Sequence, residues 1–430
     1  MNLPQRPSEE KSRHPYSATR RWLFLAVMAL ASIAAAADQQ LISVVLEPIK
    51  TEFHLSDQTV GLLAGFAFAA CLAVSGIPLG RLADRGDRRL IISLSMAGWS
   101  LMTVLSGLAT SFWTLFVARV GVGIGEAGSG PAIWSLVTDY FPEAERPRTN
   151  GILYASASMG AFAAYAAGVQ LAASLGWRGA FLGFGILGVL FAPLCWLILR
   201  EPRRSVRGVS LSNSQERSSS ALRALSKKRS FVGICLASII YNIAAAGDVV
   251  FGVSYLTRVL KLDVTVYGTI LGFVVAGATL VGSAGGGAVL AVLSRRDPAW
   301  LVKAPALVVI LSVPVIAWGY LATEPALYFT SYFILMAGIA ALAPGIISAL
   351  QMVAGSSRRA MAFATLTLLV TLFGQGLGPP IVGAISDYLS AEWGPAEGLR
   401  YALLLSAMLY IPAGIVFWIA GNSVVRDTEA

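Results

Sequence analysis

The segment Gly80-Arg81-Leu82-Ala83-Asp84-Arg85-Gly86-Asp87-Arg88-Arg89 separates two long apolar stretches of the chain. The stretch before it covers about 58–82, and the stretch after it covers 90–109. A helix needs roughly 20 apolar residues to cross about 30 Å of hydrocarbon, so each stretch is long enough to span a membrane. This pattern of apolar stretches joined by a short basic segment predicts a helical membrane protein.

The composition is also that of a membrane protein. The chain has 430 residues, of which 56% are hydrophobic and 13% are charged, and its mean hydropathy is +0.70. Soluble proteins carry about 25% charged residues, so this composition argues against soluble enzymes, nucleic-acid-binding proteins and disordered scaffolds. The net charge of +9 could indicate a nucleic-acid partner, but lysine and arginine also gather on one side of membrane proteins.

Apolar stretches of membrane-spanning length recur along the whole chain. The longest hydrophilic interruption, residues 200–229, is rich in serine, arginine and lysine and divides them into six and six. We therefore predict an all-α membrane protein with an N-terminal tail over 1–21, six-helix bundles over 22–199 and 230–421, a linker over 200–229 and a tail over 422–430. The twelve predicted transmembrane helices cover approximately 22–47, 58–82, 90–109, 112–137, 150–174, 178–199, 230–256, 265–293, 301–322, 326–354, 360–386 and 398–421.

The distribution of lysine and arginine predicts the orientation of these helices. If the N-terminus is cytoplasmic, 26 of the 32 basic residues lie in cytoplasmic segments, five lie on the outer side and Arg119 lies within the membrane. Cytoplasmic loops of membrane proteins carry such an excess, so both termini are predicted to be cytoplasmic. The net charge is thereby explained without a nucleic-acid partner.

The two halves of the chain contain similar short sequences at nearly constant separation. Residues 34–38 read Ala-Ala-Ala-Ala-Asp and residues 244–248 read Ala-Ala-Ala-Gly-Asp, an offset of 210. Two further matches are Pro131 and Arg146 with Pro344 and Arg359, and Gly176-Trp177-Arg178 with Gly398-Leu399-Arg400. Parallel six-helix repeats are typical of secondary transporters whose substrate site lies between the halves.

Residues that bind metals or cofactors are scarce. The chain has two histidines, His14 and His54, and three cysteines, which lie in apolar stretches without CxxC spacing. Gly123-x-Gly125-x-x-Gly128 has dinucleotide-binding spacing, but it lies in an apolar helix with no preceding strand, so we interpret its glycines as helix-packing residues. We predict no metal site, no cofactor and no enzyme activity.

The basic segment at 80–89 also carries a candidate gate. Asp84 ends an apolar helix among arginines, so it can contact Arg88, Asp139 at the end of the fourth helix, or the positive N-terminus of the eleventh. Such contacts would hold a cytoplasmic gate closed. The alternative is a solvated loop whose charges serve only the orientation. The residues that we assign to the latch are Gly80, Asp84, Arg85, Arg88 and Asp139.

This segment resembles the Gly-x-Leu-Ala-Asp-Arg-x-Gly-Arg-Arg motif that lies between the second and third helices of the major facilitator superfamily. Gly86-Asp87 replaces the usual x-Gly, so the turn is shifted by one residue and a charge is added. The resemblance covers essentially the whole chain. It implies the major facilitator fold, with twelve helices in two halves and transport by alternating access.

Three charged residues of the first half lie within predicted transmembrane helices: Asp38, Arg119 and Glu126. An ionisable group at this depth costs about 2.5–3.5 kcal/mol even on insertion scales and normally faces a partner or a polar cavity. Asp38 and Arg119 lie at similar depth, which predicts a salt bridge or a shared polar site. Glu126 lies two turns from Arg119, about 10 Å along the helix, and has no obvious partner, so it is the better proton carrier. The alternative is that these charges only hold helices together.

The second half offers few polar groups within its helices. Asn242, Asp248 and Gln375 are candidates for the substrate cavity, and their surroundings are mostly Leu, Ile, Val, Ala and Phe. A sugar site would need more hydrogen-bonding side chains than these. An amphiphile could place an anionic head group near Arg119 and its tail against the apolar second half. For Asp248 the alternative is a purely structural role.

The sequence over 119–148, with Gly-Ile-Gly-Glu-Ala at 123–127, is similar to the Spinster family within this superfamily. Members of that family also have an aspartate near the middle of the first helix, as Asp38 is here. The resemblance implies proton-linked movement of lysophospholipids or sphingoid lipids, with the three embedded charges in the cavity. Gly128-Ser129-Gly130 replaces the Ser-Tyr that usually follows Glu-Ala, which removes an aromatic residue.

We therefore predict a proton-coupled secondary active transporter that moves an amphiphilic, lysophospholipid- or sphingoid-like substrate by alternating access. A drug/proton antiporter and an organic-anion permease are alternatives in the same superfamily, and a non-transporting receptor is the alternative from another class. The expected partners are the substrate, protons and membrane lipid, without nucleic acid, and a monomer is expected. Alanine-, glycine- and arginine-rich sequence with short loops favours a bacterial inner membrane.

Overall fold

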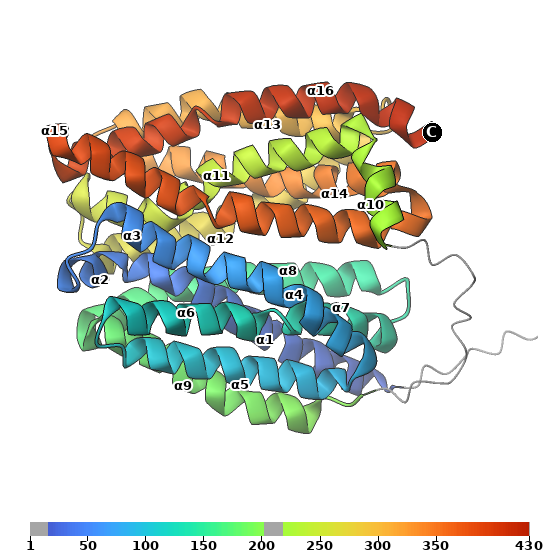
Figure 1. Ribbon diagram of the computed structural model, residues 1–430, viewed down its shortest axis with the longest axis horizontal. Helices are drawn as coiled ribbons and strands as arrows, with labels where there is room; N and C mark the ends of the chain where they lie inside the picture. Colours follow the sequence, from blue (N-terminus) through green and yellow to red (C-terminus); the bar gives the residue numbers. More distant parts are fainter. Residues whose placement is uncertain (1–15, 202–217, 430) are drawn as a thin grey trace, which may run out of the picture.

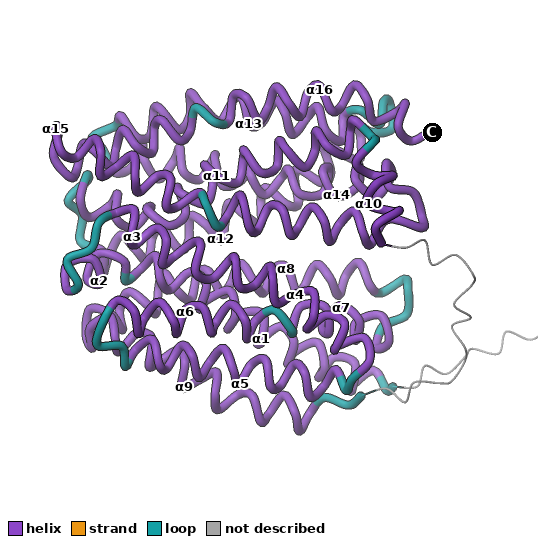
Figure 2. The backbone as a smooth tube through the Cα atoms, in the orientation of Figure 1, coloured by secondary structure: helices purple, strands orange, loops and turns teal. Residues whose placement is uncertain are grey.

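The computed structural model describes residues 16–201 and 218–429, and within these ranges all regular structure is helical (Figure 2). Three short segments, labelled η, are π-helical. The first half forms α1 (Ala18–Val44), α2 (Leu46–Glu52), α3 (Asp57–Gly61), η1 (Leu62–Phe66), α4 (Ala67–Arg85), α5 (Arg88–Gly107), α6 (Phe112–Glu126), α7 (Ser129–Tyr140), α8 (Arg146–Ala163), η2 (Ala164–Gly168) and α9 (Val169–Ile198). The second half forms α10 (Ser218–Ser226), α11 (Arg229–Arg258), α12 (Val264–Leu293), α13 (Trp300–Leu321), α14 (Pro325–Leu369), η3 (Val370–Gln375), α15 (Gly378–Ala407) and α16 (Tyr410–Glu429).

Side-chain caps explain where several helices begin. Ser17, Ser56, Ser111 and Asp263 each accept a hydrogen bond from a backbone N–H in the first turn of the helix that follows. Asp87 does the same for α5, accepting from the N–H of Leu90 at 3.1 Å. The residue that departs from the superfamily motif therefore serves as the N-cap of α5.

Glycines with positive φ divide three of the long helices. Gly176 in α9, Gly355 in α14 and Gly394 in α15 have φ of +72°, +70° and +80°, a conformation that residues with a side chain rarely adopt. Each of these helices therefore consists of two segments that meet at the glycine. In the second half the break falls at Gly394, so Gly398, which the sequence comparison pairs with Gly176, lies after the break within the helix.

The fourth predicted helix is also divided. α6 ends at Glu126 and α7 begins at Ser129, with glycines on both sides of the break. Gly125 packs directly on the backbone of Trp99 in α5, where a side chain would not fit. This contact agrees with the prediction that the glycines of this segment allow close helix packing.

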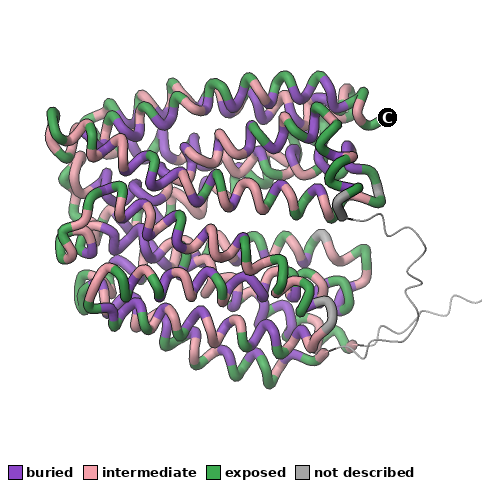
Figure 3. The backbone as a smooth tube through the Cα atoms, viewed as in Figure 1, coloured by how far each residue is buried: buried purple, intermediate pink, exposed green. Residues whose placement is uncertain are grey.

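Nine helical segments among the described residues are long and apolar enough to cross a membrane. Two of them, 148–198 and 357–428, are 51 and 72 residues long and contain Gly176 and Gly394. Buried residues concentrate where helices face one another, and exposed residues lie on the outside of the molecule (Figure 3). Exposed apolar side chains of this kind are expected where a protein contacts lipid, and examples on α9 are Leu187, Leu190 and Leu197.

The chain forms two helical bundles that lie against each other (Figure 1). In the first, α1 to α9, α5 packs on α9 and α1 on α8; in the second, α10 to α16, α12 and α13 pack on α14. Contacts between the bundles are made by α3 with α15, α8 with α12 and α1 with α11. We call the end at which α9 ends and α10 begins the linker end, and the opposite end, which carries α2 and α3, the distal end. The bundles meet at the distal end and diverge toward the linker end (Figure 1).

Helical structure extends beyond three of the predicted boundaries. α1 begins at Ala18, within the predicted N-terminal tail, because Ser17 caps it there. α10 lies within the predicted linker and is held by Leu225, which is fully buried. α16 continues to Glu429, through the predicted C-terminal tail.

Candidate functional site

A cavity of about 530 Å³ lies between the two bundles. Residues of α1, η1 and α4 line it on one side, and residues of α11, α14, η3 and α15 line it on the other. Asn242 and Gln375, two of the predicted cavity residues, belong to its wall. Within the described part of the chain no Asp, Glu, Lys, Arg or His lines this cavity, and its polar side chains are Gln39, Gln40, Ser238, Tyr241, Asn242, Thr367, Thr371 and Gln375.

Asp38 and Arg119 form a buried ion pair inside the first bundle, as their similar depth predicts. Nη1 of Arg119 lies 3.0 Å from Oδ2 of Asp38, and the two side chains are 1% and 5% exposed. The hydroxyl of Thr103 donates to the other carboxyl oxygen of Asp38. The guanidinium also lies 5.9 Å from the ring centroid of Phe68, a residue of the cavity wall. Because neither Asp38 nor Arg119 lines the cavity, the ion pair lies behind that wall.

Glu126 is connected to the cavity through one glutamine. It ends α6 and is 6% exposed. Gln39, which lines the cavity, donates from Nε2 to Oε2 of Glu126 at 2.6 Å. The other carboxyl oxygen, Oε1, is buried and has no hydrogen-bond partner among the described residues. The three embedded charges therefore divide into a closed ion pair and a separate carboxyl group.

Asp248 lies inside the second bundle and is fully buried. The hydroxyls of Tyr320 on α13 and Tyr410 on α16 each donate to one of its carboxyl oxygens at 2.9 Å. Its neighbours on α11, Ala245 and Val249, belong to the cavity wall, but Asp248 does not. The structure thus places this candidate away from the cavity that Asn242 and Gln375 line.

At the linker end, Arg88 binds two carboxylates within the first bundle. Nη2 of Arg88 lies 2.7 Å from Asp139 at the end of α7 and 2.6 Å from Glu201, which follows α9. No sequence motif identifies Glu201 as a partner of Arg88. Of the other predicted latch residues, Gly80 lies on α4, and the side chains of Asp84 and Arg85 fall outside the described residues.

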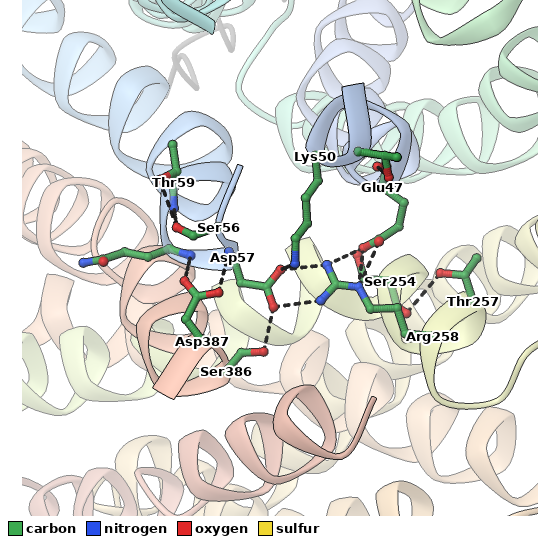
Figure 4. Close-up of polar contacts among 12 residues, drawn as sticks. Glu47, Lys50, Ser56, Asp57, Thr59, Ser254, Thr257, Arg258, Ser386 and Asp387 are labelled. Carbon is green, nitrogen blue, oxygen red and sulfur yellow. Dashed lines mark hydrogen bonds and ion pairs between the residues drawn. The ribbon is translucent and has the colours of Figure 1, made fainter. Parts of the chain in front are cut away.

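At the distal end, charged residues of the two bundles bind one another (Figure 4). Arg258, at the end of α11, donates to both carboxyl oxygens of Asp57 at 2.7 Å and to those of Glu47 at 2.8 Å. Lys50 also binds Asp57, and the hydroxyl of Ser386 donates a hydrogen bond to Asp57 at 2.7 Å. We call these residues the distal cluster: Glu47, Lys50 and Asp57 from the first bundle, and Arg258, Ser386 and Asp387 from the second.

Backbone contacts accompany the distal cluster. Asp387 accepts hydrogen bonds from the N–H groups of Asp57 and Gln58 at 2.8 Å each, at the N-terminus of α3. Gly383 of α15 packs on the carbonyl of Asp57, and Gly61 packs on the backbone of Pro379, with no room for a Cβ at either glycine. Side-chain charges and close backbone packing therefore hold the bundles together at this end.

The distal cluster is not predicted from the sequence. From the sequence, Lys50 and Arg258 are recognised only as two of the five basic residues on the predicted outer side. Asp57 and Arg258 are 201 residues apart, and no local spacing links them. The available signal was weak: Glu47 is the last residue of the first predicted helix, and Asp57 lies in the outer loop that follows it.

Comparisons with known proteins agree with the fold. Residues 28–372 match the family described as the Major Facilitator Superfamily. An MFS-type efflux pump from Mycolicibacterium smegmatis is 29% identical, with 99% of each chain aligned. Protein spinster homolog 1 from Xenopus tropicalis is 25% identical, over 91% of this chain and 79% of the relative.

A solved structure supports the same relationship. It is that of a bacterial homologue of the human lysosomal transporter Spinster, in an inward-facing and unoccupied conformation. That protein is 28% identical to this chain, and the superposition covers 96% of this chain and 99% of that one with a TM-score of 0.87. The resemblance to Spinster proteins that the sequence indicates is confirmed.

Proposed function

Because the chain belongs to the major facilitator superfamily, a family of multi-pass membrane transporters, we propose that it is a proton-coupled secondary active transporter of an amphiphilic, lysophospholipid- or sphingoid-like substrate. One observation carries this proposal. The cavity between the bundles has a buried carboxyl group, that of Glu126, one hydrogen bond behind its wall. The side chain of Gln39 would thus contact both the substrate in the cavity and the carboxyl group of Glu126 that binds the proton.

The proposal includes the topology. Among the described residues, nine spans become twelve if 148–198 is divided at Gly176, 357–428 is divided at Gly394, and α6 with α7 is added as one crossing. Each bundle then crosses the membrane six times. Within residues 16–201 and 218–429, most of the basic residues lie at the linker end, so we assign this end and both termini to the cytoplasm. We propose 22–199 and 230–421 as the two domains, and a monomer in a bacterial inner membrane.

Alternating access follows from the two ends of the molecule. In this orientation the distal cluster is the outer gate, and it is closed. The bundles diverge toward the cytoplasmic end, and the similar Spinster homologue was solved in an inward-facing state. We therefore assign the present structure to the inward-facing state, from which opening of the distal cluster leads to the outward-facing state.

The lining of the cavity supports an amphiphilic substrate. The amide groups of Gln39 and Asn242 and the hydroxyl of Thr371 can bind a polar head group. The apolar side chains around Met336 and Leu342 can bind a tail. No basic side chain lines the cavity in the described part of the chain. This favours a zwitterionic, neutral or amine-bearing head group over a free anion, and it argues against an organic-anion permease.

Proton coupling is assigned to Glu126 acting through Gln39. An ionised Glu126 accepts the hydrogen bond from the Gln39 amide, whereas a protonated Glu126 can itself donate one. Protonation would therefore change the hydrogen bonds that Gln39 offers to a substrate and shift the population between the two states. Arg119 is already neutralised by Asp38, so we assign that pair to holding α1 against α6.

Drug efflux with proton antiport is the second candidate. It is favoured by the efflux pump from Mycolicibacterium smegmatis, which aligns with this chain over its full length. A largely apolar cavity without charged lining residues also suits hydrophobic drugs. Both candidates require proton coupling, so the substrate panel must separate them.

The test of substrate class is uptake into proteoliposomes that contain the purified full-length protein. Lysophosphatidylcholine, a sphingoid base, a cationic hydrophobic drug and a small organic anion are compared with protein-free liposomes. We expect saturable, protein-dependent uptake of the lysolipid or the sphingoid base. Uptake of the drug alone would support the efflux assignment, and uptake of the organic anion alone would exclude both candidates.

A further inference from the structure

Asp248 occupies in α11 the position that Asp38 occupies in α1, 210 residues earlier in a similar sequence. Both side chains are buried inside their own bundle. Asp38 is neutralised by Arg119 at 3.0 Å. Asp248 instead accepts two hydrogen bonds from the neutral hydroxyls of Tyr320 and Tyr410. The equivalent carboxyl groups of the two halves therefore have different partners, a cation in the first half and two neutral hydroxyls in the second.

The surroundings of Asp248 contain tyrosines and no cation. Within the described residues no lysine, arginine or histidine forms an ion pair with it. On α11 itself, Arg258 binds the distal cluster and Arg229 is the first residue of the helix, and on α15 Arg400 binds Glu397 at 2.6 Å. α15 meets α11 beside Asp248 through Val382. The ionisable side chains that face Asp248 are Tyr241 on α11, Tyr320 on α13, Tyr328 and Tyr332 on α14, and Tyr410 on α16.

An ionised carboxyl group is expensive in such a place. Burying an unpaired charge costs far more than burying a neutral acid with its hydrogen bonds made, and a group in this situation gains a proton instead. A tyrosine hydroxyl can accept a hydrogen bond as well as donate one, so the two tyrosines satisfy the neutral acid equally well. We propose that Asp248, with Tyr320 and Tyr410, is a second proton-binding site, and that it holds its proton in the conformation described here.

Tyr241 links this site to the cavity. Its ring lies 5.6 Å from the ring of Tyr410, and the residue belongs to the cavity wall. Its hydroxyl is buried and has no hydrogen-bond partner among the described residues. Tyr241 therefore places the Asp248 site next to the cavity, in the bundle that does not contain Glu126. The proposal for Asp248 is consequently independent of the role proposed for Glu126, and either proposal can be disproved without the other.

Infrared spectroscopy of the full-length protein in lipid nanodiscs at neutral pH tests this proposal. A protonated carboxyl group gives a C=O stretching band that a carboxylate lacks. We expect Asp248→Asn to remove a component of this band. The double variant Asp38→Asn with Arg119→Met is the matched control and should leave the band intact, because it removes a carboxyl group that forms an ion pair with a cation and not with tyrosine hydroxyls. The component should also persist in Glu126→Gln, which separates it from any contribution of Glu126. A band that Asp248→Asn leaves unchanged would overturn the proposal.

Two further variants keep the test decisive if Asp248→Asn does not fold. Tyr320→Phe and Tyr410→Phe each retain the carboxyl group and delete one hydrogen bond. Each should shift the frequency of the same component, since a carboxyl stretch responds to its hydrogen bonds. Tyr328→Phe is the control, because its hydroxyl has no partner among the described residues. If neither Tyr320→Phe nor Tyr410→Phe shifts the band, the site does not hold a proton.

Discussion

Asp38 and Arg119 stabilise the first bundle only as a pair. Removal of one partner leaves a charge that is buried without compensation, which typically costs about 3–5 kcal/mol. We expect Arg119→Met to lower the stability of the purified protein by about this amount, because Asp38 then keeps only the hydrogen bond from Thr103. Thermal unfolding in detergent measures the change.

The double variant Arg119→Met with Asp38→Asn is the control for this prediction. It removes both charges, and the Asn amide oxygen can still accept from Thr103. We expect the double variant to recover most of the lost stability. A double variant as unstable as Arg119→Met would show that shape, and not the unpaired charge, decides stability at this position.

The pairing of Asp38 with Arg119 could be predicted from the sequence, and the partners of Asp248 could not. Asp38 and Arg119 are isolated charges in apolar helices at similar depth, so each has few partners of opposite sign to choose from. Asp248 is bound by tyrosines from α13 and α16, and the chain has 13 tyrosines without a pattern that selects two of them. Neutral donors leave no signature in the charge distribution.

At the scale of elements, α3 and α15 meet through glycine. Gly383 packs on the carbonyl of Asp57 without room for a Cβ. We expect Gly383→Ala to separate the bundles at the distal end, and to lengthen the distance between spin labels attached at Thr51 of α2 and Glu392 of α15. Electron paramagnetic resonance of a variant without native cysteines measures this distance.

Gly76→Ala is the matched control for Gly383→Ala. Gly76 also lies in a membrane-spanning helix, α4, but its Cβ would meet nothing within 4 Å. It should leave the distance distribution unchanged. An unchanged distribution in Gly383→Ala as well would mean that the distal contact tolerates a methyl group and does not depend on close backbone packing.

Sequence length and apolarity predict which segments are helical, but not how the helices are interrupted. The breaks at Gly176, Gly355 and Gly394 depend on backbone conformations that only a few of the 43 glycines adopt. Gly125 of α6 instead allows close packing on Trp99 of α5. One residue type thus has two opposite uses, and its identity alone does not distinguish them.

At the scale of the whole molecule, the distal cluster should set the balance between the inward-facing and outward-facing states. Arg258→Gln removes the charge that binds Asp57 and Glu47 across the bundles. If the variant lowers the free energy that favours the inward-facing state by about 1–2 kcal/mol, the population shifts about 5- to 30-fold toward the outward-facing state. The same pair of spin labels reports this as growth of a longer distance.

Arg178→Gln controls for loss of a distal charge. Arg178 binds Glu52 at 2.6 Å, and both residues belong to the first bundle. It should therefore leave the distance distribution as it is in the unmodified protein. If Arg178→Gln and Arg258→Gln shift the distribution equally, the effect comes from the net charge of the distal end and not from a gate across the bundles.

The two-bundle architecture could be predicted from the sequence because it follows from local composition repeated along the chain. The gate could not, because Arg258 meets Asp57 only after the bundles have docked. The motif at 80–89 predicts a latch at the linker end, where Arg88 binds Asp139 and Glu201 within one bundle. The contacts that close the present structure lie at the opposite end.

The most direct test of proton coupling through Glu126 compares two assays on the same proteoliposomes. One assay measures exchange of labelled for unlabelled substrate at equal pH, and the other measures accumulation driven by a pH gradient. We predict that the Glu126→Gln variant keeps exchange and loses gradient-driven accumulation. The variant still binds substrate through Gln39, but a glutamine at position 126 cannot bind and release a proton. Glu145→Gln, which alters a carboxylate paired with Arg21 at the linker end, should behave like the unmodified protein. Accumulation by Glu126→Gln that still follows the pH gradient would contradict this account.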